Sequence, residues 1–69
     1  MSIDALALIL ENAYACKIDS LPYGKVIRFQ AHKGGNWKQI EIDSMVYATL
    51  YSRYKNVVEK WEAGLDEQS

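Results

Sequence analysis

The chain has 69 residues, a formal net charge of −1, 49% hydrophobic residues and 25% charged residues. This length allows one domain with a thin core, and the composition is that of a folded protein and not of a disordered one. The charge gives no general attraction to nucleic acid. One cysteine and one histidine cannot form an intramolecular disulfide or a four-ligand zinc site. We therefore expect close packing or a homodimer to supply the stability.

The N-terminal segment is predicted to be a helix from Ser2 to about Cys16, because its apolar residues recur at steps of three and four. Ser2 or Asp4 can cap its start. The apolar run 5–10 is too short to span a membrane and lacks the basic flank of a signal peptide. Together with the single cysteine, this leads us to expect a cytoplasmic protein without a membrane partner.

A β-hairpin is predicted next. The turn Leu21-Pro22-Tyr23-Gly24 leads into a strand over Lys25–His32, and a second strand covers Trp37–Asp43. A two-residue turn at Gly34-Gly35 would fix the register. The expected pairs are Phe29 with Ile40, Ile27 with Ile42, Arg28 with Glu41, Gln30 with Gln39, and His32 with Trp37.

A long second helix is predicted from Met45 to about Ala63, capped by Asp43 or Ser44 and ended by Gly64. Residues 65–69 form a short acidic tail, so the single domain covers 1–64. The expected fold class is α+β with the order helix, hairpin, helix (αββα). The two helices would pack on one face of the hairpin or be exchanged within a dimer. This order is similar to the layout of small phage head-completion proteins, in topology only.

Catalytic chemistry has little support in the sequence. A nucleophile–base pair could only be Cys16 with His32, and the simpler interpretation is a small buried thiol on the helix and a separate surface imidazole stacked on Trp37. Glu41 and Asp43 share a strand face but have no evident pocket, and Arg28 is the expected partner of Glu41. We expect no enzyme activity, no metal and no cofactor.

The hairpin is locally basic. Residues 17–40 hold five basic residues against the single acidic Asp19. An alternative nucleic-acid site would use Lys25, Lys33, Lys38 and the aromatic ring of Trp37. Lysines are also common on exposed strand edges, where they prevent aggregation, so a solvated hairpin is the competing interpretation.

An aromatic stripe along the second helix is the main candidate for partner binding. Tyrosine and tryptophan favour half-exposed surfaces and are enriched at interfaces. The stripe consists of Tyr47, Tyr51, Tyr54, Val58 and Trp61, with Trp37 as a second anchor. The competing interpretation places these rings at the rim of a monomer core with their hydroxyls in water.

These features favour a small non-enzymatic protein-binding module, namely an accessory, adaptor or inhibitor protein that acts by occupying a partner's surface. The alternative is a nucleic-acid-binding protein that uses the basic hairpin. A third hypothesis is an assembly component encoded by a phage or mobile element. The sequence itself does not identify a partner.

Overall fold

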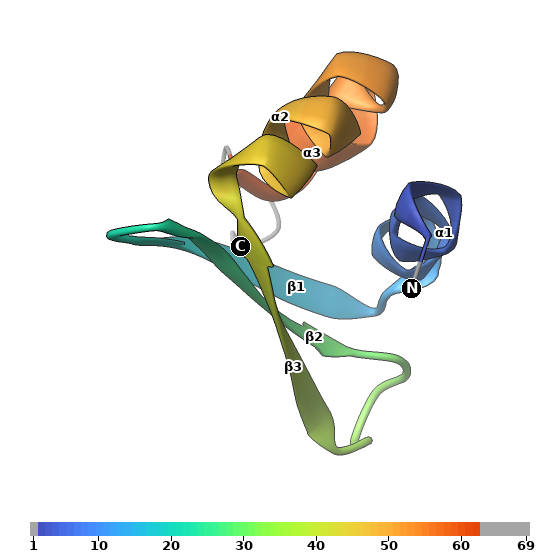
Figure 1. Cartoon of the computed structure of the whole chain (residues 1–69). Helices are drawn as coiled ribbons and strands as arrows, with labels where there is room; N and C mark the ends of the chain where they lie inside the picture. The colour runs from blue at the N-terminus through green and yellow to red at the C-terminus, as the bar shows by residue number, and fades with distance from the viewer. Residues whose placement is uncertain (1, 63–69) are drawn as a thin grey trace.

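The helices lie on one side of a twisted antiparallel sheet (Figure 1). The computed structural model describes residues 2–62. In chain order the elements are α1 (Ile3–Asn12), β1 (Ala15–Leu21), β2 (Gly24–Gln30), β3 (Trp37–Asp43), α2 (Ser44–Arg53) and α3 (Lys55–Glu62). The α+β class and the hairpin between flanking helices are confirmed. The predicted stop at Gly64 and the tail 65–69 lie outside the described residues.

The first helix is shorter than predicted, because the segment that follows it forms a third strand. Ser2 caps α1 by accepting from the Ala5 amide, and the helix ends at Asn12. Ala13 is already extended, and the Tyr14 amide donates to the Gln30 carbonyl, which starts the pairing of β1 with β2. The prediction of helix up to Cys16 is therefore wrong. The added strand also means that the chain does not have the helix, hairpin, helix order on which the phage-protein resemblance was based.

The sheet has the strand order β1-β2-β3. The predicted turn at Leu21–Gly24 is confirmed as the connection of β1 to β2. Between β2 and β3 the register differs by two residues from the prediction, since Ile27 lies opposite Ile40 and Phe29 opposite Lys38. Side chains alternate with a period of two, so a shift of two residues keeps every side chain on its predicted face.

The double glycine explains this shift. It does not form the hairpin turn alone but lies within the loop 31–36 that joins β2 to β3. The Gly35 amide donates to the His32 carbonyl at 2.9 Å, and Gly34 takes the third turn position with φ +79°, a conformation that favours glycine. Gln30 Nε2 donates to the Gly35 carbonyl at 2.9 Å, which ties the loop to the end of β2.

The predicted long helix is two helices. Asp43 caps α2 by accepting from the Val46 amide at 2.8 Å, as expected. The helical path is interrupted at Tyr54, whose backbone has φ −129° and ψ 47°. No glycine or proline is present there, so long-range contacts and not local propensity turn the chain. After the interruption α3 runs back beside α2 and packs on β1.

The core lies between the helices and the sheet. Its fully buried side chains include Leu6 and Leu10 of α1, Ile27 of β2, Leu50 of α2 and Val58 of α3. Trp61 is also buried, and its Nε1 donates to the Leu10 carbonyl at 2.8 Å, so its polar group is satisfied. This bond joins the last described helix to the first one.

Candidate protein-binding surface

The aromatic stripe predicted for partner binding divides into two groups in the structure. Val58 and Trp61 are 0% and 5% exposed and belong to the core. Their burial gives both side chains a packing role, and the contact role predicted for these two residues stays a prediction. The physical reason for the burial is the interruption at Tyr54, which directs α3 towards the sheet. Tyr47, Tyr51 and Tyr54 pack partly buried against the core.

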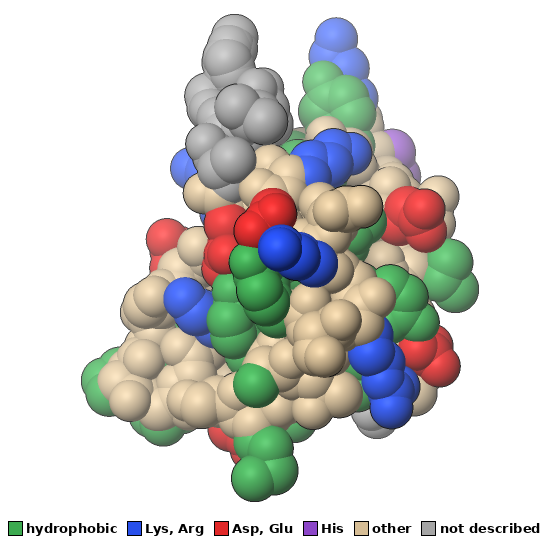
Figure 2. Space-filling model, turned by 90° about the horizontal axis from the view of Figure 1, so that it is seen from above, with side chains coloured by type: hydrophobic (Ala, Val, Ile, Leu, Met, Phe, Trp, Pro, Cys, Tyr) green, Lys and Arg blue, Asp and Glu red, His purple; other side chains and the backbone are tan. Residues whose placement is uncertain are grey.

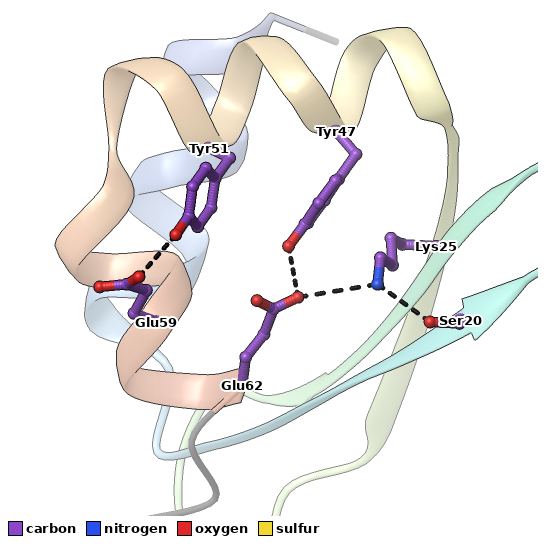
Figure 3. Close-up of polar contacts among 6 residues, drawn as sticks. All are labelled: Ser20, Lys25, Tyr47, Tyr51, Glu59 and Glu62. Carbon is purple, nitrogen blue, oxygen red and sulfur yellow. Dashed lines mark hydrogen bonds and ion pairs between the residues drawn. The ribbon is translucent and has the colours of Figure 1, made fainter.

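The hydroxyl of each of these three tyrosines donates a hydrogen bond to a carboxylate. Tyr51 donates to Glu59 at 2.5 Å and Tyr47 donates to Glu62, so two residues of α2 bind two residues of α3 (Figure 3). Tyr54 donates to Asp4 of α1. We call these three contacts the phenol–carboxylate pairs. They use, within the chain, the hydroxyls that a partner would otherwise bind.

The pairs change the acidity of the phenols. Burial is the first cause that raises the pKa of Tyr47, and the hydrogen bond to Glu62 adds to it. For Tyr51 and Tyr54 the hydrogen bonds to Glu59 and Asp4 are the first causes that raise the pKa. A carboxylate beside a phenol opposes a second negative charge, so all three side chains stay protonated at neutral pH.

The predicted basic site is not assembled as a unit. Lys25 lies at the start of β2, where its Nζ is 2.9 Å from Ser20 Oγ, 3.9 Å from Glu62 Oε2 and 4.9 Å from the centre of the Tyr47 ring (Figure 3). Lys38 and Trp37 lie instead at the start of β3, and Lys33 lies in the loop beside them. Trp37 remains 50% exposed. Among residues 2–62, neither Lys33 nor Lys38 takes part in an ion pair.

The residues considered for catalysis either lie apart from one another or make structural contacts. Cys16 is 2% exposed and lies in the core, whereas His32 is exposed in the loop. Asp43 caps α2, and Glu41 accepts from the Tyr23 hydroxyl at 3.3 Å. Within residues 2–62, no group of three or more His, Cys, Asp or Glu side chains could hold a metal ion.

The outer face of the sheet carries a polar network in place of the expected Arg28–Glu41 pair. Arg28 donates to Asp19 at 3.1 Å and to Gln39 at 3.4 Å. Gln39 lies directly opposite Arg28 because of the shifted register, which corrects the predicted partner. These exposed side chains satisfy one another, as on an ordinary solvated face.

An open apolar groove lies on the other face of the sheet, between α1 and β3. Its volume is about 280 Å³. We call it the α1–β3 groove; it is lined by Ser2, Ile3, Leu6, Ile40, Glu41, Ile42, Asp43 and Val46. A separate, smaller apolar hollow of about 160 Å³ lies between α1 and the end of β2, with Phe29 in its lining. The side of the core beneath α1 is therefore incompletely covered.

The groove adjoins a free strand edge. In the strand order β1-β2-β3 formed by residues 2–62, β3 pairs on one side only. The Ser44 amide donates to the Tyr23 carbonyl at 3.0 Å, so Ser44 directs its backbone groups towards β2. The direction of the backbone amide and carbonyl alternates from one residue to the next along an antiparallel strand. The backbone groups of Ile40 are therefore also directed towards β2. The backbone groups of Trp37, Gln39 and Glu41 are consequently directed to the open edge.

A third hollow has a different character. It has a volume of about 400 Å³ and lies between α1 and the junction of α2 with α3. Glu11, Arg53 and Lys55 are part of its lining, so charges of both signs surround it. Over the helices, acidic and basic side chains are likewise interspersed and do not form a patch of one sign (Figure 2). The α1–β3 groove is the more apolar and the more enclosed of the two.

The α1–β3 groove was not predicted from the sequence. It depends on how the start of α1 is placed relative to β3 and the start of α2, which no local pattern in the sequence predicts. The only available signal was Ile40 and Ile42, which alternate with polar residues and lie in an edge strand. Neither isoleucine is fully buried.

None of the helices within residues 2–62 is long and apolar enough to cross a membrane. In comparisons with known proteins, no family model, no curated protein and no solved structure matches the chain significantly.

Proposed function

We propose that the protein is a small non-enzymatic protein-binding module that accepts apolar side chains of a partner in the α1–β3 groove. The observation that carries the proposal is the apolar lining left open beside the unpaired edge of β3. A groove of about 280 Å³ lies at the lower end of the size of small-molecule sites, roughly 300–1,000 Å³. It suits one or two side chains of a protein segment.

The charge of the rim indicates the kind of segment. The acidic residues Glu41 and Asp43 are among those that line the groove, and none of the lining residues is a lysine or arginine. A partner segment with apolar residues next to Lys or Arg would match both the apolar floor and the acidic rim. An accessory, adaptor or inhibitor protein needs only such occupancy and no catalytic group.

The test is a selection of displayed peptides on the full chain, followed by NMR mapping of the selected peptide. We expect apolar peptides with basic flanks, and shifts concentrated at Ile3, Ile40, Ile42 and Val46. Val46→Trp should fill the groove and weaken binding about tenfold or more, equivalent to ~1.4 kcal/mol. Tyr51→Phe, on the opposite side of the helical layer, is the control and should leave the affinity unchanged. The proposal would be contradicted if Val46→Trp bound the peptide as tightly as the wild-type chain does, or if the NMR chemical-shift changes were centred on α3.

Nucleic-acid binding is a second candidate, because Trp37 is half exposed and has Lys33 and Lys38 near it. The site would be the loop end of the hairpin without Lys25, which contacts Glu62. Retardation of single-stranded DNA or RNA at low salt, lost as salt rises, would support it. Absence of retardation at low salt would remove this candidate.

A further inference from the structure

We propose that two copies of the chain associate through their β3 strands, antiparallel, with Trp37 opposite the partner's Asp43. The two sheets would then form one continuous sheet with the helices of both copies on the same side. This inference concerns the backbone edge of β3 and needs no bound segment in the α1–β3 groove, although Ile40 belongs to both the strand and the groove lining.

The edge of β3 is suited to pairing. The strand runs without interruption over Trp37–Asp43 and contains no glycine or proline. Backbone amides and carbonyls of Trp37, Gln39 and Glu41 are directed away from β2, as the alternation from Ser44 shows. Such a row of unpaired groups is a template for another strand.

Symmetry limits the possible registers. If a two-fold axis is perpendicular to the sheet, each outward-directed residue of β3 must face an outward-directed residue of the partner. Gln39 can face the partner's Gln39 or the partner's Glu41, and a third register places Glu41 opposite the partner's Glu41. Of these three registers, only the one with Gln39 opposite the partner's Glu41 pairs the strand over its whole length. That register also places Trp37 opposite the partner's Asp43. The third register is opposed by like charges.

Side chains along β3 complement themselves in this register. Lys38 lies opposite the partner's Ile42 on the face covered by helices, and Gln39 lies opposite the partner's Glu41 on the outer face. The Gln39 amide can donate to the partner's Glu41, and Ile40 meets the partner's Ile40 on the face covered by helices. The incompletely covered isoleucine thereby gains an apolar neighbour.

Disulfide formation can identify the register directly. Gln39→Cys and Glu41→Cys are introduced separately into a Cys16→Ala background, with a size tag on one of them. Residues directly opposite in a hydrogen-bonded pair have Cα atoms about 5.5 Å apart, which is within disulfide range. We expect the mixed disulfide to form about tenfold faster than that of the control Asn56→Cys on α3, whose rate reports random collision. Homodisulfides of Gln39→Cys or of Glu41→Cys as the main product, or only collisional rates, would overturn the proposal.

A second measurement covers the case in which the cysteine variants do not fold. Gln39→Pro removes an amide that is directed to the open edge and not to β2, so the monomer sheet can accept it. Ser20→Pro is the matched control, because it places the same substitution on β1, the other edge strand of the sheet. Ser20 precedes Leu21, which pairs with Gly24. We expect light scattering to show a dimer for the wild-type chain and for Ser20→Pro, and a monomer for Gln39→Pro with an unchanged circular dichroism spectrum. A wild-type chain that is monomeric up to its solubility limit would overturn the proposal.

Discussion

The two sides of the helical layer are closed to different degrees. On the side of α2 and α3, the core is sealed by Val58 and Trp61, and Tyr47 and Tyr51 donate to carboxylates of α3. On the side of α1 and β3, isoleucines line an open groove. Apart from Trp37, the aromatic residues that suggested an interface therefore pack within the fold, whereas aliphatic residues line the open groove.

Truncation of the core should show this difference most strongly. Trp61→Ala removes a buried indole and its hydrogen bond to Leu10, and we expect a loss of about 3–5 kcal/mol in the free energy of unfolding. Ile42→Ala on the open side removes a side chain that is only partly buried, and about 1 kcal/mol is expected. Urea unfolding of both variants is the measurement. Equal losses would show that the two sides are equally closed.

The contact of β2 with the end of β3 gives the next largest effect. A Cβ at Gly24 would lie 2.0 Å from the Ile42 carbonyl oxygen, a backbone atom that cannot move aside. We expect Gly24→Ala to cost about 1–3 kcal/mol, in the range of overpacking substitutions, and to disturb the wall of the α1–β3 groove. At Gly35 the new Cβ would meet the His32 ring, an exposed side chain that can rotate. Gly35→Ala should therefore cost less than Gly24→Ala in the same thermal unfolding measurement, and the reverse order would contradict the structure.

Alkaline pH should lower the free energy of unfolding through the closed side, and this effect is expected to be the smallest of the three. The pKa values of Tyr47, Tyr51 and Tyr54 are raised in the folded chain. The unfolded chain loses these protons first, so their stabilisation is complete below about pH 10 and decreases as the pH rises above it. Urea unfolding at a series of pH values should show a steeper alkaline loss for the wild-type chain than for Tyr47→Phe/Tyr51→Phe. Tyr14→Phe, which removes a phenol outside the phenol–carboxylate pairs, is the control. If the free energy of unfolding fell equally steeply with pH in all three chains, a stabilising role of the phenol–carboxylate pairs would be contradicted.

Local signals predicted part of this fold correctly. Alternation placed Ile27 and Ile40 on the core face, and the caps at Ser2 and Asp43 are where short polar side chains suggested them. The strand 15–21 was missed because its first residues also fit the helical period of the segment before it. The interruption at Tyr54 could not be predicted, since contacts with residues such as Asp4 and Glu59 hold it and local helix propensity favours a continuous helix.

The candidate surface was less predictable than the fold. Burial decides which aromatic residues are available, and the burial of Trp61 follows from the return of α3 along α2. The α1–β3 groove likewise exists only because residues of α1 and β3, distant in sequence, line the same hollow. Sequence periodicity describes one element at a time and carries no information on such gaps.

Residue-resolved amide hydrogen exchange at increasing protein concentration tests most directly whether the side of α1 and β3 is the binding side. In the isolated chain the amides of Gln39 and Glu41 are directed to solvent. We predict that their exchange slows as the concentration rises, while exchange in α3 stays constant. Exchange at Gln39 and Glu41 that is fast at every concentration, or slowing that is confined to α3, would contradict the account.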